Sequence, residues 1–293
     1  MTAPAIPSSP SAERDGLVRP LEFRDLPDLD RLLDADPVAH CFVASRLDEV
    51  RTGNRRHRLA SDFWIVERGG RCVAALHLGA NVVPIATDDA ARRILADRLR
   101  RGGRRGSSLV GPAEEVLDLW RLLDGAWGPA REVRARQPLL ALDRAPSVAP
   151  DPGVRAVRPQ ETDLLVPACI AMFTEEVGIS PVSGGAGAAY RARVAELVQA
   201  GRALARIENG RVVFKAEIGA ASSRACQIQG VWVAPDRRGQ GLSAPGVAAV
   251  AEIARERIAP IVSLYVNDYN SVARRCYEAV GFRAAGEFAT VLL

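Results

Sequence analysis

The chain has 293 residues, of which 48% are hydrophobic and 25% are charged. These values are typical of a folded globular protein, and the length favours two domains over one. The formal net charge of +4 is small for this length, so it favours anionic ligands only weakly and gives no support for nucleic-acid binding. No apolar run approaches the ~20 residues of a membrane span, which argues against a membrane partner.

The cysteines and the first residues predict a cytoplasmic location. The five cysteines are widely spaced and form no CxxC pair, so reduced thiols fit better than a disulfide framework or a zinc site. Residues 1–15 contain proline, serine and alanine without the basic and apolar regions of a signal peptide. We expect them to form a disordered lead-in, and we expect no metal site.

The first half of the chain, residues 16–143, shows strand and helix patterns that predict one domain. In chain order we expect a strand, an Arg/Pro turn and a helix over 17–36, a hairpin over 63–79, a helix over 90–101, a strand over 107–111 and a helix over 113–123.

A proline-rich stretch, residues 144–152, predicts a linker to a second domain over 153–293. The Asn209-Gly210 pair within that domain is the strongest hairpin signal in the chain. The expected elements are a strand (153–157), two helices (162–176 and 188–199), a hairpin (203–219), a strand (226–235), a helix (242–257), a strand (261–268), a helix (271–279) and a closing pair of strands (282–293).

The two halves follow the same order of elements, which indicates an internal duplication. The stretch 17–36 parallels 153–172, and the hairpin over 63–79 parallels that over 203–219. The first copy has no counterpart of the RxxGxG pattern of the second, since its corresponding stretch reads GANVVPIATDDAARR. We therefore expect the first copy to be a structural or substrate-shaping relative of the second.

The stretch APDRRGQGLSA, residues 234–244, places two glycines one residue apart and predicts a loop that binds phosphates. A P-loop requires a lysine within its motif, and the one lysine of the chain, Lys215, lies well before it. A dinucleotide-binding loop follows its strand directly and precedes several strand–helix units, whereas here residues 235–238 intervene and too little chain follows. We reject the first interpretation and disfavour the second.

The third interpretation is the RxxGxG/A loop of coenzyme A binders, formed here by six residues. These are Arg238, Gly239, Gln240, Gly241, Leu242 and Ser243. Successive backbone N–H groups at a helix N-terminus bind a pyrophosphate, and glycines let the backbone approach it closely. Pro245 suits the first turn of the next helix, where its missing N–H costs nothing. The alternative is a tight strand-to-helix turn without a ligand.

Residues around the loop follow one family's pattern: Val233-Ala-Pro235 before it, and Asn270, Ala273, Tyr277-Glu278 and Gly281-Phe282 after it. In this order they resemble the GNAT acetyltransferase superfamily. The whole chain resembles a two-domain bacterial group in which a domain of unknown function, itself a degenerate GNAT-like fold, precedes a GNAT domain. The resemblance implies an α/β (α+β) fold of tandem GNAT-like domains, each a mixed, mostly antiparallel sheet flanked by helices. Ser243 departs from the family's usual glycine or alanine, but it is still small.

The resemblance implies that acetyl-CoA, or another acyl-CoA, lies between two neighbouring strands that splay apart. The backbone of Val231 and Val233, with Trp232 between them, would bond the pantetheine arm and polarise the thioester carbonyl. Asn270 would either cap the following helix or bond the same arm. In the family an amine attacks the thioester directly, so the implied activity is that of an acyl-CoA-dependent N-acyltransferase.

The resemblance implies Tyr277 as the acid that protonates the departing thiolate. A phenol with a reference pKa near ~10 keeps its proton at neutral pH and can donate it to sulfur. The alternative is that Tyr277 is a core aromatic residue of its helix. Cys276 has no histidine near it in sequence, so we interpret it as packing and not as a nucleophile.

The general base is not determined by the sequence. Glu217 is the best-placed carboxylate, and alternation puts it on the same strand face as Lys215. A solvent-facing pair of these two side chains is an equal alternative, and a chain of waters could also remove the proton. Glu175 and Glu176 would either attract a cationic amine or form a solvated helix end.

The acceptor stays open beyond its class, a primary amine of a small molecule or a peptide, and so do the acyl chain length and the oligomeric state. The alternative function is a non-catalytic acyl-CoA-binding module that regulates or binds a partner. The one dense basic stretch, residues 98–108, has no interleaved aromatic residues and is typical of a solvated loop. We therefore expect no nucleic-acid partner.

Overall fold

The computed structural model describes residues 16–52 and 59–293. The lead-in expected at residues 1–15 lies outside these ranges. The chain divides into two compact units: unit 1 comprises Met1–Pro138 with Gly286–Leu293, and unit 2 comprises Leu139–Ala285. Residues 286–293, which local sequence patterns place with the second domain, thus lie in unit 1.

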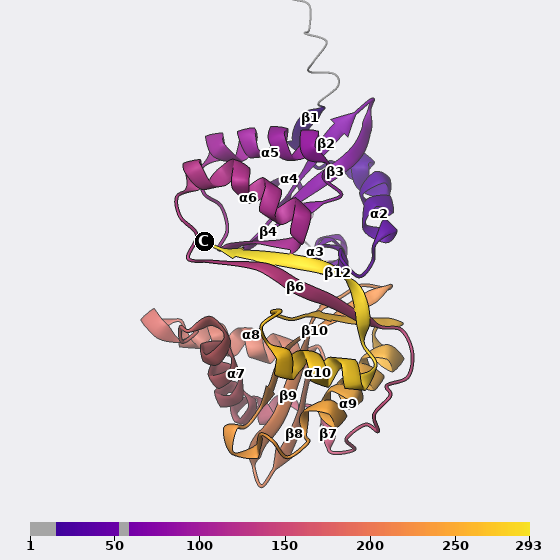
Figure 1. Cartoon of the computed structure of the whole chain (residues 1–293), viewed down its shortest axis with the longest axis vertical. Coiled ribbons are helices and arrows are strands. Elements are labelled where there is room, and N and C mark those ends of the chain that lie inside the picture. The colour runs from indigo at the N-terminus through magenta and orange to yellow at the C-terminus, as the bar shows by residue number, and fades with distance from the viewer. Residues whose placement is uncertain (1–15, 53–58) are drawn as a thin grey trace, which may run out of the picture. The chain divides into compact units, whose positions relative to one another are not determined.

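Unit 1 is a sheet with helices on its faces (Figure 1). Its elements are β1 (Leu17–Pro20), α2 (Leu26–Ala35), α3 (Cys41–Thr52), α4 (Leu59–Asp62), β2 (Phe63–Arg68), β3 (Arg71–Leu78), β4 (Asn81–Ile85), α5 (Asp89–Gly102), β5 (Ser108–Pro112), α6 (Ala113–Trp127) and the first part of β6 (Glu132–Leu142). The strands run in the order β1-β2-β3-β4-β5-β12, and β4 and β5 are parallel while the other neighbours are antiparallel. Leucines of α5 and α6 pack with Leu76 and Leu109 of the sheet to form the core.

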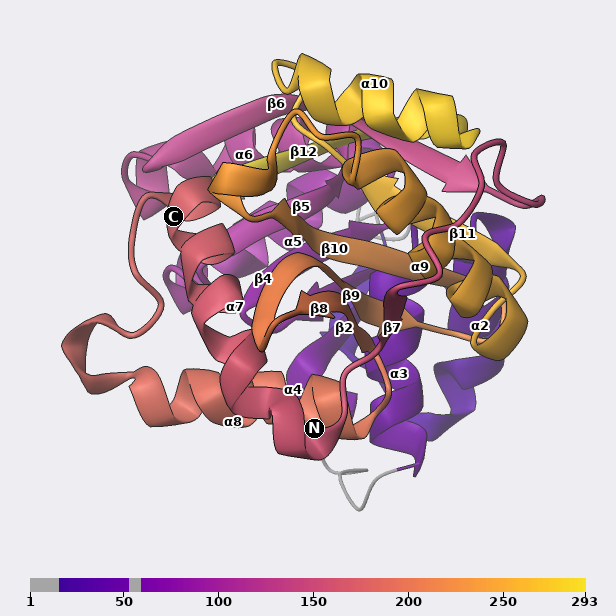
Figure 2. The ribbon, with the colours of Figure 1, turned by 90° about the horizontal axis from the view of Figure 1, so that it is seen from below.

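Unit 2 repeats this plan. Its elements are β7 (Val154–Ala156), α7 (Thr162–Val177), α8 (Gly187–Gln199), β8 (Ala203–Glu208), β9 (Arg211–Ala221), β10 (Ala225–Val233), α9 (Ser243–Arg257), β11 (Ile261–Tyr265) and α10 (Ser271–Val280). The strand order is β7-β8-β9-β10-β11-β6, and only β10 and β11 are parallel. Figure 2 shows α9 and α10 on one face of this sheet and α7 and α8 on the other, each pair over its own apolar cluster.

The two units share details that support the internal duplication. Apart from the short α4, the order of their elements is the same. The hairpins match in register, since Phe63 pairs with His77 in one and Ala203 with Glu217 in the other, and each carries one β-bulge at the matching place. The Asn209-Gly210 turn has positive φ at both residues, as the hairpin signal predicts.

The turn from the first strand into the first helix is also repeated. In unit 1 the Arg19 guanidinium lies 2.6 Å from a carboxylate oxygen of Asp25, and in unit 2 Arg155 lies 2.7 Å from Glu161. Each carboxylate also accepts the backbone N–H three residues before it. The hydrogen bond from Arg155 lowers the pKa of Glu161 to about 2, so this pair stays ionised at neutral pH.

The last strands of the two copies are exchanged. β6 ends the first copy in sequence, yet Leu139–Leu142 pair with β11 in unit 2. The final strand, β12 (Arg283–Leu292), pairs through Phe288–Leu292 with β5 in unit 1. The closing pair of strands expected over 282–293 is thus wrong: this stretch is one strand, whose partner is far away in sequence.

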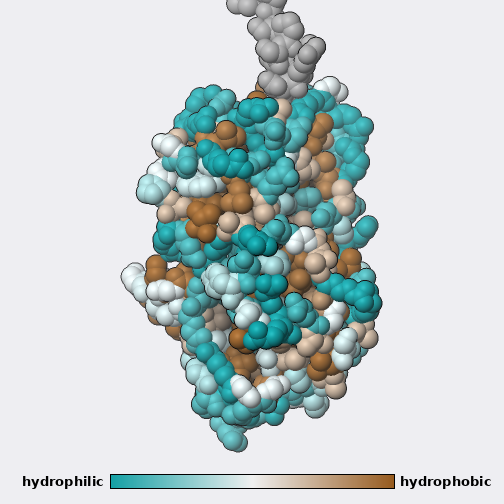
Figure 3. Space-filling model, in the orientation of Figure 1, coloured by the Kyte–Doolittle hydropathy of each residue, from teal (hydrophilic) through white to brown (hydrophobic). Residues whose placement is uncertain are grey.

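The molecular surface carries scattered apolar side chains. On the face drawn in Figure 3, hydrophobic residues stand among hydrophilic ones over both units. The most exposed large apolar side chains of unit 2 are Tyr269 and Val272, each 70% exposed. Within the described ranges, no helix combines the length and the apolar content that crossing a membrane requires.

Candidate functional site

The parallel strands β10 and β11 separate part-way along their length, as the sequence analysis expected. They pair from Ala225–Ile261 to Gln227–Ser263, and in the described chain they do not pair beyond that point. β10 nevertheless continues to Val233 and β11 to Tyr265. This leaves a V-shaped opening whose apolar surroundings belong to the core beneath α9 and α10.

A β-bulge interrupts β10 at the point where the V begins. Gln229 pairs with Glu217, and Trp232 pairs with Lys215. Between these two pairs β10 therefore has one residue more than β9. Gly230, at the bulge, has a φ of +60°, which favours glycine. The bulge changes which backbone groups of β10 face β9 and which face the V.

The predicted pantetheine-binding residues differ in orientation. The backbone N–H of Ala234 donates to Val213 on β9, so the backbone of Val233, one residue earlier, faces the open side. The Val233 carbonyl accepts a hydrogen bond of 3.1 Å from Arg238 Nε. The Trp232 side chain packs instead into the apolar cluster beneath α7 and α8.

The predicted phosphate loop joins β10 to α9. Gly239 and Gly241 have φ values of +73° and +76°, and both positions face open space. α9 begins at Ser243, and Pro245 lies in its first turn, where no intrahelical donor is needed. Among residues 16–52 and 59–293, no acceptor receives the backbone N–H groups of 239–244. The loop therefore presents a row of free donors at the start of a 15-residue helix.

The arginine of this loop is tied to α7. Arg238 Nη2 lies 2.7 Å from Glu175 Oε2, and Trp232 Nε1 donates to Glu175 Oε1 at 3.2 Å. Glu175 thus links the end of α7, the strand β10 and the phosphate loop. The sequence predicts only a substrate-side charge or a solvated helix end for Glu175, because no local pattern indicates a partner more than fifty residues away.

Tyr277 lies on α10 and its ring forms part of the core of unit 2. The side chain is 8% exposed and contacts Phe282 edge-on at 6.1 Å between ring centres. Burial raises the pKa of its phenol, and the charge of Glu176 adds to this effect. No group in the described part of the chain bonds its hydroxyl.

Asn270 and Cys276 both precede Tyr277 in the chain, and each has a defined structural role. Asn270 caps α10, since its side-chain oxygen accepts the backbone N–H of Ala273 at 3.1 Å. Cys276 packs against the core, and burial raises the pKa of its thiol. A nucleophilic cysteine needs the opposite shift, so the structure agrees with the packing role.

A pocket of about 360 Å³ lies beside the start of the V. Two helices, α7 and α8, form its walls, and β9, β10 and the end of β11 form the rest. Its lining comprises Met172, Phe173, Glu176 and Val177 of α7, Tyr190, Arg193, Val194 and Leu197 of α8, Glu217, residues 228–230 and Tyr265. The helix residues are not recognisable from sequence, because an amphipathic helix that lines a pocket has the same pattern as one that fills a core.

Lys215 and Glu217 form a buried ion pair next to this pocket. Lys215 is fully buried, Glu217 is 6% exposed, and Lys215 Nζ lies 2.5 Å from Glu217 Oε1. The two side chains share one strand face, as alternation predicted. The solvent-facing alternative is wrong, because α7 and α8 cover that face of the sheet.

Comparison with known families agrees with this geometry. Residues 188–282 match the Acetyltransferase (GNAT) family. They form a GNAT domain. Residues 61–165 match a domain of unknown function, DUF4081. No curated protein matches the sequence.

Solved structures resemble the whole chain. A GNAT acetyltransferase from Sphaerobacter thermophilus is 17% identical with a TM-score of 0.59, over 94% of each chain. A tandem GNAT protein from the clavulanic acid biosynthesis pathway is 16% identical with a TM-score of 0.54, over 94% of this chain and 98% of its own. A GNAT acetyltransferase from Colwellia psychrerythraea is 12% identical with a TM-score of 0.54, over 94% and 99%. At these identities the likeness concerns the fold alone, and it confirms the predicted tandem GNAT architecture.

Proposed function

We propose that unit 2 transfers an acetyl group from acetyl-CoA to a primary amine by direct attack. The observation that carries this proposal is the row of free N–H donors at residues 239–244, together with the V between β10 and β11. The row suits a pyrophosphate, and the open edge of β10 offers the backbone of Val231 and Val233 to the pantetheine arm. The pocket lined by Glu176 and Glu217 also includes residues 228–230 of β10 and Tyr265 of β11, the two strands that form the V.

In the proposed reaction the amine nitrogen forms a bond to the thioester carbon, and the carbon–sulfur bond breaks. One proton leaves the amine, and one must reach the departing thiolate. Tyr277, protonated and without an internal partner, donates the second proton. Glu217 accepts the first; Glu176 and bound water are the alternative acceptors. The acceptor is the amine of a small molecule or a peptide, held in the pocket between α7 and α8.

The test is an acceptor screen that measures release of free CoA from acetyl-CoA by the full chain. Amine-dependent release supports the proposal, and longer acyl-CoA esters in the same assay determine the preferred acyl length.

We place the activity in the cytoplasm, because none of the five cysteines forms a disulfide in the described structure.

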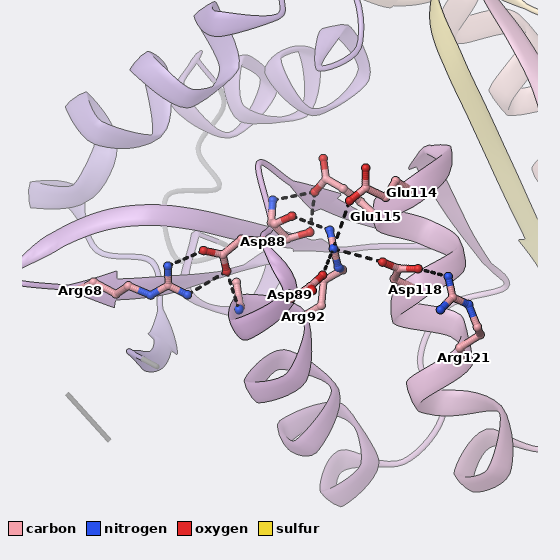
Figure 4. Close-up of polar contacts among 10 residues, drawn as sticks. Arg68, Asp88, Asp89, Arg92, Glu114, Glu115, Asp118 and Arg121 are labelled. Carbon is pink, nitrogen blue, oxygen red and sulfur yellow. Dashed lines mark hydrogen bonds and ion pairs between the residues drawn. The ribbon is translucent and has the colours of Figure 1, made fainter. Parts of the chain in front are cut away.

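Unit 1 is proposed to bind no acyl-CoA, because the corresponding helix start carries carboxylates of the chain itself (Figure 4). Glu115 accepts hydrogen bonds from the Thr87 backbone N–H at 2.7 Å and from its hydroxyl at 2.6 Å. Asp88 caps α5 by accepting the Ala91 N–H at 2.8 Å and also pairs with Arg68. These oxygens stand where phosphate oxygens would bind, and their charge repels an anion.

The expected stoichiometry is therefore one acetyl-CoA per chain. Isothermal titration calorimetry of the full chain measures it directly. A second acetyl-CoA site that persists when changes in the loop of unit 2 remove the first would contradict the assignment of unit 1.

Glu175→Gln is expected to tighten acetyl-CoA binding. The variant keeps the side chain's shape but removes a negative charge beside the phosphate loop, and Arg238 becomes available to the ligand. Because the Arg238–Glu175 pair is about half exposed, the gain should be modest, roughly two- to five-fold at low salt, and should shrink at high salt. Calorimetry at two ionic strengths measures it, with Glu252→Gln on α9 as the matched charge control. A weaker affinity would show that Glu175 instead holds Arg238 in its binding position.

A further inference from the structure

Unit 2 contains a buried ion pair, Lys215 and Glu217, which packing of the core alone does not require. Lys215 is the single lysine of the chain, and every other cationic side chain except histidine is an arginine. It is fully buried, at an interior position where a buried ion pair is often matched in stability by apolar side chains of similar size. A pair of this kind that borders a pocket is a candidate for a role in the chemistry of that pocket.

The surroundings of the pair single out Glu217 as its pocket-facing member. Glu217 lines the pocket, whereas Lys215 lies behind it, beneath the bulge of β10. A Cβ placed on Gly230 would come within 3.1 Å of Lys215 Nζ, so glycine at the bulge leaves the space that the ammonium group occupies. The glycine at the bulge therefore makes room for the buried lysine side chain.

Other groups face the pair from the helices above it. From α7, Cys169 Sγ lies 3.4 Å from Glu217 Oε1, and burial raises the pKa of this thiol to about 12, so it stays neutral. From α8, Tyr190 donates its hydroxyl to the Cys169 carbonyl at 3.1 Å, and burial raises the pKa of its phenol. The charged groups on the pocket wall are Glu176 and Arg193. Lys215 is thus the cation in direct contact with Glu217.

We propose that Lys215 is a positioning residue that keeps the Glu217 carboxylate ionised and aimed into the acceptor pocket. The inference rests on the proposed function, in which Glu217 takes the proton that the amine loses as its nitrogen bonds to the thioester carbon. The step moves one proton from the amine nitrogen to a carboxylate oxygen of Glu217, and Lys215 stays paired with that carboxyl group. Without Lys215, burial at 6% exposure favours the neutral form of this carboxyl group, so a smaller fraction of it can accept a proton at neutral pH.

The experiment titrates Glu217 in the full chain by ¹³C NMR of labelled glutamate carboxylates, with the Glu217→Gln spectrum identifying the resonance. We expect Glu217 to be ionised at pH 7 in the natural protein. In Lys215→Met its protonation should move up by about one to three pH units. If Lys215→Met does not fold, Lys215→Gln replaces it in the same titration. An unchanged titration in the folded variant, or a protonated Glu217 at pH 7 in the natural protein, overturns the proposal.

Turnover separates this proposal from the proposed function. With phenylethylamine as the probe acceptor, Lys215→Met should release CoA more slowly at pH 7, by up to about three-fold from the lost ionisation, and should recover as the pH rises. The double variant Lys215→Met, Glu217→Gln should match Glu217→Gln alone and should keep the fold, since no charge is left unpaired. A natural protein that binds acetyl-CoA but acetylates no amine would contradict the proposed function, while the NMR titration would still decide how Lys215 acts on Glu217.

Discussion

Gly241→Asp is expected to abolish acetyl-CoA binding. Gly241 has a φ of +76° at the start of α9, and its N–H belongs to the row of free donors. An aspartate there places a side chain and a negative charge where the pyrophosphate would bind, in a conformation that only glycine adopts easily. We expect the affinity to fall at least about 100-fold, which corresponds to roughly 3 kcal/mol.

The matched control is Gly210→Asp. Gly210 has a φ of +73° in the hairpin turn of the same unit, and, as at Gly241, nothing lies within contact distance of an added Cβ. Both variants therefore introduce the same residue, charge and backbone strain, but only one lies in the loop. Calorimetric titration that shows equal affinity for the two variants would place the acyl-CoA site elsewhere.

Tyr277→Phe is expected to lower kcat by about 10²- to 10⁴-fold, the usual range for loss of a general acid. The variant keeps the ring in the core beside Phe282 and removes only the hydroxyl, which has no partner in the described structure. The Kd for acetyl-CoA should stay within about two-fold of the natural value, because the loop of residues 238–243 is untouched. Since burial raises the pKa of the phenol, the donor should stay protonated to at least about pH 9.

Tyr269→Phe serves as the control for Tyr277→Phe. Tyr269 is 70% exposed on the loop before α10, and its hydroxyl accepts a hydrogen bond from Asn267, so the same deletion there should leave kcat unchanged. A Tyr277→Phe variant with full turnover would show that Tyr277 is not the general acid. A natural protein that binds acetyl-CoA and turns over no amine would favour the alternative of a binding module.

The local features of this fold could be predicted from the sequence. Asn209-Gly210 indicated the hairpin turn, and the glycines at 239 and 241 indicated a loop before a helix, where the structure has positive φ at both positions. These features depend on a few neighbouring residues whose conformational preferences are strong. The tandem architecture was predictable because the second copy repeats the order of elements of the first.

Features that depend on distant contacts could not be predicted. The exchange of β6 and β12 rests on strand pairings that join residues far apart in sequence, such as Val291 with Leu109. The burial of Lys215 depends on α7 and α8 covering one face of β9, which alternation along the strand does not indicate. The Glu175–Arg238 link joins two exposed charges whose sequence surroundings are ordinary.

The central claim is that unit 2 binds acetyl-CoA at the loop before α9. Thermal unfolding of the full chain with and without 1 mM acetyl-CoA, and with NADH as the comparison ligand, tests it most directly. We predict that acetyl-CoA raises the melting temperature by about 5 °C or more, that NADH does not, and that Gly241→Asp removes the effect. An unchanged melting curve at millimolar acetyl-CoA would contradict the claim.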